Sequence, residues 1–163
     1  MERLSPTCEA GDLAVAASVR TGDRTSVFVV CPSGANSHHG CACHIGAYQT
    51  DARVFHGVEE AGSLTEFNLI DGTQVLARGA DGISVCSNMP MPYLHATMKD
   101  GVLDLEASQP PVQLRLDVGP MRRVVSIRLN RRELPVPADH GGTFLIYGAD
   151  WSGPVRDLLT STA

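Results

Sequence analysis

Residues 64–107 read LTEFNLIDGTQVLARGADGISVCSNMPMPYLHATMKDGVLDLEA and carry the pattern that decides the fold. Short runs rich in apolar, β-branched and aromatic residues are separated by turn residues, which is typical of β-strands. Asp71-Gly72 and Asp100-Gly101 each stand between two such runs and predict hairpins, because Asp-Gly readily adopts the positive φ angles of tight turns. Asp81-Gly82 predicts a further turn. The strands expected in this segment cover 64–70, 73–78, 82–87, 92–98 and 102–107.

The same pattern continues on both sides of this segment. TSVFVVC, residues 25–31, is a continuous apolar run that predicts a strand buried on both faces. Only the tail at 154–159 has a helical pattern. Further strands are expected over 13–19, 52–58, 111–118, 123–130 and 142–148. The sequence therefore predicts an all-β fold with little helix, a single antiparallel, jelly-roll-like β-sandwich domain over residues 1–163.

Composition narrows the classes of partner. The chain has 163 residues, 43% of them hydrophobic and 19% charged, which is ordinary for a globular domain. A net charge of -5 argues against nucleic acid as a partner, since phosphate binding usually needs a basic face. No apolar run approaches the roughly 18 residues of a transmembrane helix, so no membrane partner is expected. No signal peptide is recognisable, and extracellular and cytoplasmic locations both stay open.

Five cysteines are present, at positions 8, 31, 41, 43 and 86. An odd number leaves at least one of them outside intramolecular disulfides. Cys41 and Cys43 are not expected to pair with each other, because one intervening residue makes a strained ring. A Cys8–Cys31 bridge and a Cys31–Cys86 bridge both stay open. Cys86 alternates with apolar neighbours and is expected to be a small core residue.

The segment HHGCACH, residues 38–44, concentrates metal-ligating side chains. His39, Cys41, Cys43 and His44 form a candidate site for zinc or copper, which imidazole and thiolate ligands favour. An extended backbone would place Cys41 and Cys43 on the same side. Their spacing matches neither the usual zinc motifs nor the haem-attachment motif. A polar loop with two buried thiols is the alternative interpretation.

A second constellation favours proton-transfer chemistry. His38, His39 and Tyr48 are candidate catalytic acids or bases, and Asn36 and Arg53 are candidate ligand-binding residues. Polysaccharide lyases abstract a proton beside a uronate carboxylate, which requires a neutralising polar or basic group and a His or Tyr for proton transfer. Residues of these types are also common in ordinary loops.

Two more residues are candidate ligand contacts. Arg122 could pair with an acidic saccharide, and Trp151 could stack on a sugar ring. Their alternatives are a solvated strand end for Arg122 and a buried anchor for Trp151. His95 is expected to be a hydrogen-bonded sheet histidine, and His56 could face either side of its strand.

Two stretches of the chain resemble parts of a known family. They are SHHGCACHIGAY (37–48) and the later run from ADGISVCSN (80–88) to VVSIRLNRREL (124–134). In these stretches the chain resembles the C-terminal β-sandwich region of heparinase II/III-like polysaccharide lyases. The resemblance implies an accessory module or a detached relative of such enzymes, with His38 or His39 as the matching residue. Cys41 and Cys43 stand where the family expects an acidic residue, and the family's helical toroid is missing. These departures argue against an independently active lyase.

Three function hypotheses follow from the sequence. The first is a carbohydrate-associated module that binds an anionic polysaccharide or oligosaccharide, or assists its processing. The second is a zinc- or copper-binding protein centred on residues 38–44. The third is a self-assembling structural domain whose sheet edges pair into a homo-oligomer. Whether the chain is an enzyme stays open, and a lyase-like reaction is the expectation if it is one.

Overall fold

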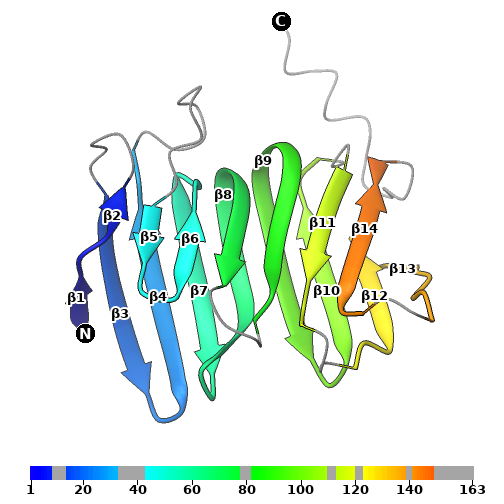
Figure 1. Cartoon of the computed structure of the whole chain (residues 1–163), viewed down its shortest axis with the longest axis horizontal. Coiled ribbons are helices and arrows are strands. Elements are labelled where there is room, and N and C mark those ends of the chain that lie inside the picture. Colours follow the sequence, from blue (N-terminus) through cyan, green and yellow to red (C-terminus); the bar gives the residue numbers. More distant parts are fainter. Residues whose placement is uncertain are drawn as a thin grey trace, which may run out of the picture.

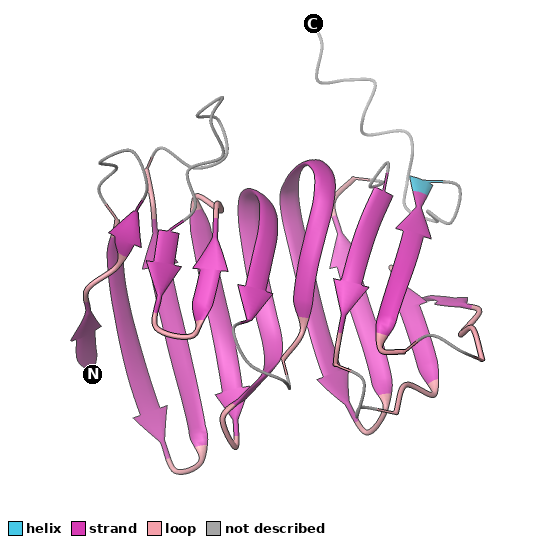
Figure 2. Cartoon of the chain, in the orientation of Figure 1, coloured by secondary structure: helices cyan, strands magenta, loops and turns pink. Residues whose placement is uncertain are grey.

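The computed structural model of the chain describes residues 1–8, 14–32, 43–77, 82–109, 113–119, 123–138 and 141–148. These residues form 14 strands of one continuous sheet, which folds over into two facing layers (Figure 1). Strands make up most of the described chain (Figure 2). The prediction of an all-β, sandwich-like fold is therefore confirmed.

Two long strands, β8 (Ser63–Ala77) and β9 (Ser84–Lys99), pair with each other and run through both layers. The other strands belong to one layer each. The first layer contains β1 (Glu2–Leu4), β3 (Val15–Thr21), β4 (Arg24–Val30), β7 (Val54–Glu60), β10 (Val102–Ala107), β12 (Ser126–Leu129) and β13 (Arg132–Leu134). The second layer contains β2 (Thr7–Cys8), β5 (Cys43–Ile45), β6 (Tyr48–Thr50), β11 (Gln113–Asp117) and β14 (Thr143–Tyr147).

The order of strands in each layer follows from this division. The first layer runs β1-β3-β4-β7-β8-β9-β10-β12-β13, and the second runs β2-β5-β6-β8-β9-β11-β14. Neighbouring strands are antiparallel except for β10 and β12, which pair in parallel. The sandwich is thus antiparallel with a single parallel pair among the described strands.

The core fills the space between the layers. Inward-facing residues alternate with outward-facing ones along each strand, as the pleat of a strand requires. Phe55 and Phe67 of the first layer, and Leu114 and Leu116 of the second, are fully buried within one hydrophobic cluster. Burial of one such side chain contributes about 2 kcal/mol to folding. These alternating apolar positions therefore hold the two layers together.

The prediction that residues 25–31 are buried on both faces is wrong. Val27 and Val29 of β4 point into the core, but Phe28 and Val30 lie on the outer face and are 44% and 46% exposed. The second layer covers only one side of this strand. The apolar run of β4 is therefore continuous because apolar side chains occupy its outer face as well as its inner face.

The Asp-Gly sequences have different outcomes. Asp100-Gly101 forms the predicted hairpin between β9 and β10, with φ angles of 51° and 80°. The hairpin predicted at Asp71-Gly72 is wrong, because β8 continues through it. Asp71 has a φ of 48°, and the pairing with β9 shifts between Gly72 and Gln74. The Asp-Gly pair thus bends β8 from one layer toward the other instead of reversing the chain.

Two strands predicted separately are one bent strand in the structure, as in β8. The runs 82–87 and 92–98 form the single strand β9, which also bends as it passes between the layers. Asp81 of the predicted third turn lies outside the described residues, as does the helical pattern at 154–159. No helix of the described chain is long and apolar enough to span a membrane.

Candidate functional site

Several residues predicted to form a site lie outside the described part of the chain. These residues are Asn36, His38, His39, Cys41, Arg122 and Trp151. The structure describes the remaining four, which are Tyr48, Arg53, Cys43 and His44. It does not bring these four together into one site.

Tyr48 lies in the core. Its side chain is 4% exposed, its ring packs against Phe55 with 5.8 Å between centroids, and its hydroxyl donates a hydrogen bond to a carboxylate oxygen of Glu59. Burial, followed by the hydrogen bond and the charge of Glu59, raises the pKa of the Tyr48 phenol far above its usual value. A phenol in this environment stays protonated and is shielded from an external ligand.

Arg53 lies just before β7 and is paired with Asp71. The guanidinium Nη2 is 2.7 Å from Asp71 Oδ2, and the Arg53 backbone N–H donates to the Asp71 carbonyl at 3.1 Å. These two contacts attach the start of β7 to the bend of β8. The Asp71 carboxylate therefore partly neutralises the positive charge of Arg53.

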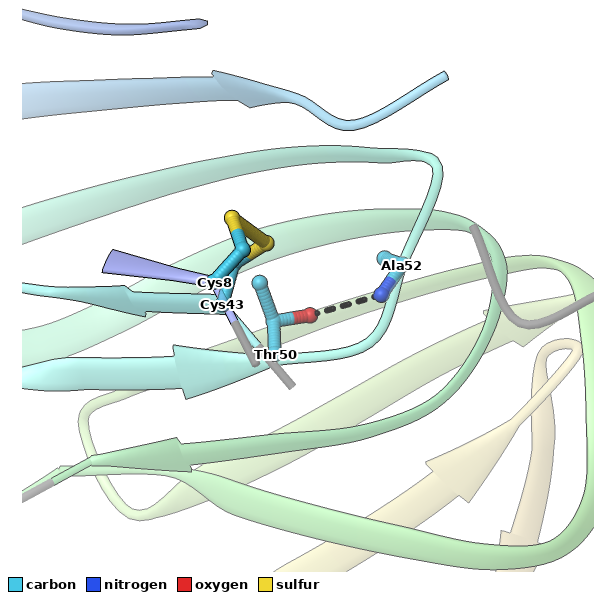
Figure 3. The surroundings of a disulfide bond; sticks show 4 residues. All are labelled: Cys8, Cys43, Thr50 and Ala52. Atoms are coloured by element: carbon cyan, nitrogen blue, oxygen red, sulfur yellow. Dashed lines mark hydrogen bonds between the residues drawn. A yellow bond between two sulfur atoms is a disulfide. The ribbon is translucent and has the colours of Figure 1, made fainter. Parts of the chain in front are cut away.

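Cys43 and His44 point to opposite faces of β5, because neighbouring residues of a strand alternate. Cys43 is buried and forms a disulfide with Cys8, which lies directly opposite on β2 (Figure 3). His44 is half-buried on the other face. The two predicted metal ligands therefore cannot approach one ion from the same side of this strand.

A third sulfur lies beside the disulfide. Cys31 follows β4 in the first layer, is 3% exposed, and its Sγ lies within 4.8 Å of the sulfurs of Cys8 and Cys43. We call Cys8, Cys31 and Cys43 the cysteine triad. Thr50 lies directly opposite Cys43, and its hydroxyl accepts a hydrogen bond from the Ala52 N–H at 3.1 Å (Figure 3). The triad therefore joins both layers through an ordered polar and sulfur-rich corner.

The outer face of the first layer holds a second cluster. Phe28, His56, Asn68 and His95 stand directly opposite one another on β4, β7, β8 and β9. We call these four residues the cross-sheet row. Neighbouring strands lie about 4.8 Å apart, so the cross-sheet row spans about 14 Å. Its side chains share the solvent-facing side because each lies one position from an inward-facing residue of its strand.

Direct contacts connect the members of the cross-sheet row. The rings of Phe28 and His56 stack with 4.4 Å between centroids and 15° between planes. Asn68 Nδ2 donates to His56 Nδ1 at 3.4 Å, and Asn68 Oδ1 accepts from His95 Nδ1 at 2.9 Å. The hydroxyl of Tyr93 donates to the same oxygen at 3.4 Å. Asn68 therefore orients three ring-bearing side chains on an open surface.

The charge state of this surface is close to neutral. Burial lowers the pKa of His56, with the Glu66 carboxylate opposing that shift. Burial and then the Glu106 charge raise the pKa of Tyr93. Arg24, at the border of the surface, donates to Glu66 at 3.1 Å and lies 4.0 Å from Glu60. The neutral His56 imidazole, the Asn68 amide and the Tyr93 phenol therefore dominate the described centre of this face.

A further depression lies on the outer face of the second layer. It encloses about 380 Å³ and is lined by Gln74, Leu76, Ser84, Cys86, Arg115 and Asp117, among others. Cys86 is a free, exposed thiol, so the prediction that it is a core residue is wrong. Its side chain falls on the outer side of β9, between Gln74 and Arg115 of the neighbouring strands.

The local sequence pattern does not mark the cross-sheet row as a site. The prediction of a hydrogen-bonded sheet histidine at position 95 agrees with its contact to Asn68. Neither Asn68 nor Phe28 was singled out, because the four residues lie on separate strands and only the pairing register aligns them. A search for outward-facing His, Asn and aromatic positions on paired strands could have found them.

Comparisons with known proteins add no assignment. No protein-family model matches the chain, and no curated protein matches it significantly.

Proposed function

We propose that the outer face of the first layer binds a carbohydrate chain through the cross-sheet row and Tyr93. The observation that carries the proposal is the alignment of Phe28, His56, Asn68 and His95 across four neighbouring strands. The resemblance of parts of the sequence to the sandwich region of polysaccharide lyases points to the same class of ligand.

The chemistry of the row suits the two faces of a sugar. A pyranose ring presents C–H groups that pack on an aromatic surface and hydroxyls that need hydrogen-bonding partners. The exposed ring of Phe28, stacked on His56, supplies the apolar surface. Asn68 and the imidazoles supply donors and acceptors. A row about 14 Å long has room for a short oligosaccharide.

Preorganisation supports the proposal further. Asn68 contacts both imidazoles and Tyr93, and the paired strands fix the backbone beneath it. A ligand that binds ordered side chains loses less conformational entropy in forming its hydrogen bonds. An isolated, unconnected set of the same residues would bind more weakly.

The described charges favour recognition of hydroxyls over recognition of carboxylates. Arg24 is already paired with Glu66, and Arg53 with Asp71. The sequence-based expectation of an anionic glycan rested partly on Arg122, which lies outside the described residues. We therefore expect neutral and uronate-containing oligosaccharides both to be bound, without a strong preference for the acidic ones.

The test is titration of the full chain with neutral and uronate oligosaccharides, followed by calorimetry. Asn68→Ala should weaken binding about fivefold to tenfold, since a net hydrogen bond contributes about 1 kcal/mol. Phe28→Ala should weaken it by a similar factor. Leu145→Ala is the matched control, because Leu145 is similarly exposed (50%) but belongs to β14 in the other layer. Equal binding by wild type and the Phe28 and Asn68 variants would contradict the proposal.

A lyase-like reaction is a second candidate for the same face. Tyr93 and His95 converge on the Asn68 amide, and these are the residue types that proton abstraction beside a uronate requires. The raised pKa of Tyr93 suits a proton donor better than a base, which leaves His95 as the candidate base. Formation of an unsaturated product, followed by its ultraviolet absorbance and lost in Tyr93→Phe and His95→Gln, would establish this reaction.

Self-association is the competing use of this face. Val15, Phe28 and Val30 are adjacent, exposed apolar residues on β3 and β4. Exposed apolar patches often mark interfaces. Light scattering over a range of concentrations would detect an oligomer. An oligomer dissociated by Phe28→Ala, without any glycan binding, would favour the structural hypothesis instead.

A further inference from the structure

The cysteine triad is independent of the proposed glycan surface and lies inside the sandwich. Cys8 comes from β2, Cys31 follows β4, and Cys43 comes from β5, so the fold gathers residues that are up to 35 positions apart. All three sulfurs lie within 4.8 Å of one another. Cys31 and Cys43 are buried and Cys8 is half-buried.

We propose that the reduced triad is a three-thiolate binding site for a thiophilic d10 cation, Cu(I) or Zn(II). Thiolates select these soft or borderline ions over hard ones. A metal–sulfur bond of about 2.3 Å places the sulfurs of a shared ion about 4 Å apart. The triad already approaches this spacing, so small side-chain rotations would bring all three sulfurs onto one ion.

The donor set distinguishes this site from the one suggested by the sequence. That site combined Cys43 with His39, Cys41 and His44, whereas β5 points His44 away from Cys43. Cys8 and Cys31 replace the histidines as partners of Cys43. Three thiolates complete a trigonal Cu(I) site, while Zn(II) would take a fourth ligand such as water.

Entry of the cation requires reduction of the Cys8–Cys43 disulfide. An external dithiol supplies two electrons and two protons, so that the Sγ–Sγ bond breaks, two thiols form, and the dithiol becomes a disulfide. Binding of the cation then displaces the thiol protons into solvent. The same three sulfurs thus hold either a disulfide beside a free thiol or a metal ion.

The polar surroundings favour an ordered site. The Cys31 backbone N–H donates to the Arg53 carbonyl at 2.9 Å, which fixes the end of β4. Thr50, opposite Cys43, donates its hydroxyl to the Gln74 carbonyl at 2.8 Å and so links β6 to β8. These contacts hold the backbone around the triad whether the disulfide is formed or reduced.

The experiment uses the full chain without a histidine tag, reduced by a phosphine under anaerobic conditions. Cu(I) is titrated in competition with a chromophoric chelator, and Zn(II) is titrated separately. We expect one equivalent of at least one of the two ions per chain, with charge-transfer absorbance for Cu(I). The bound ion should also raise the thermal midpoint of the reduced protein.

Variants locate the ion. Cys31→Ser and Cys8→Ser should each weaken binding at least tenfold and abolish the rise in thermal midpoint. Cys86→Ser, which removes the exposed thiol of the other depression, should change neither. Circular dichroism shows whether each variant is folded, and Cys8 is the safer position because it is only half-buried.

Three outcomes would overturn the proposal. The reduced wild type could bind neither ion, in which case Cys31 is only a buried core thiol. Binding could survive in both Cys31→Ser and Cys8→Ser. Binding could be lost in Cys41→Ser but kept in Cys31→Ser, which would place the metal on residues 38–44. None of these outcomes bears on glycan binding, which involves a different surface.

Discussion

Asp51 is hydrogen-bonded twice to Thr73, at the point where β8 bends between the layers. Asp51 Oδ1 accepts the Thr73 backbone N–H at 2.8 Å, and Oδ2 accepts the Thr73 hydroxyl. The same Oδ1 accepts the Gln74 N–H at 2.9 Å. The buried carboxylate thus accepts hydrogen bonds from two backbone donors beside the register shift of β8.

Replacement of Asp51 should destabilise the fold at this bend. In Asp51→Ala the Thr73 and Gln74 N–H groups lose their acceptor, which should lower the free energy of unfolding by about 3 kcal/mol. Asp51→Asn keeps one acceptor oxygen and should lose less. Urea denaturation measures both values. If the free energy of unfolding of Asp51→Ala stayed within about 0.5 kcal/mol of the wild-type value, solvent would be replacing the carboxylate as the acceptor.

Gly72 should not tolerate a side chain. A Cβ at this position would lie 2.7 Å from the Cα of Ala52 and 2.8 Å from its Cβ. Such overpacking typically costs about 1–3 kcal/mol, so Gly72→Ala should lower the denaturation midpoint. The double variant Gly72→Ala/Ala52→Gly removes one of the two clashes and should recover part of the loss. No recovery in the double variant would mean that the backbone, and not the Ala52 side chain, sets the limit.

Replacement of Asn130 should destabilise the fold for two separable reasons. It has a φ of 49°, and its amide accepts the Ala107 N–H at 2.9 Å and donates to the Ala107 carbonyl at 3.1 Å. Asn130→Gly keeps the backbone conformation but loses both hydrogen bonds, for an expected cost of about 2 kcal/mol. Asn130→Ala should cost about 1 kcal/mol more, because alanine is strained at positive φ. Equal losses in chemical denaturation would contradict the role of backbone strain.

His56 should make the fold less stable in acid. Its pKa is lower in the folded protein than in the unfolded chain, so the unfolded chain binds the proton more readily. The stability it contributes is complete above its unfolded pKa of about 6.5 and is lost as the pH falls through the lower folded value. Unfolding measured at several pH values should show this loss. His56→Gln should reduce the slope of the free energy of unfolding against pH below about pH 6.5. The charged and titratable neighbours His95, Glu66 and Arg24 remain in this variant. An unchanged slope would assign the effect to other groups.

Tyr48 should support the fold at alkaline pH. Its folded pKa is raised, so the stability it contributes is complete below its unfolded pKa of about 10 and is lost as the pH rises toward the higher folded value. Tyr48→Phe removes the hydrogen bond to Glu59 and should cost about 1 kcal/mol at neutral pH. Ultraviolet titration should show a late-ionising tyrosine in wild type that disappears in this variant. Persistence of that signal at the same amplitude would assign it to Tyr93.

Local patterns predicted the strands better than they predicted the connections between them. Asp100-Gly101 and Asp71-Gly72 have the same sequence and both use a positive φ at Asp, yet one closes a hairpin and the other bends a strand. The difference depends on which strand lies alongside, and Ala52 packs against Gly72 from a different part of the chain. Pairing information of this kind is not contained in a local window.

The same limit applies to the two candidate clusters. Cys8 and Cys43 meet because β2 pairs with β5, and β2 is only two residues long. Asn68 and His95 meet because β8 and β9 share a register set by an entire layer. The sequence singles out Cys43 because His and Cys residues adjoin it in the chain. In the fold, the sulfurs that lie beside its own belong to the distant Cys8 and Cys31.

The two strands shared by both layers have a consequence for how the molecule opens. The backbone hydrogen bonds of the two layers are not independent, because β8 and β9 pair with strands of both layers. Separation of one layer would break ladders that belong to the other. Amide protons of residues 67–69 of β8 and 94–96 of β9, where the two strands pair in regular register, should therefore exchange with solvent only when the whole chain unfolds, whereas those of the outlying β1 and β13 should exchange through local fraying.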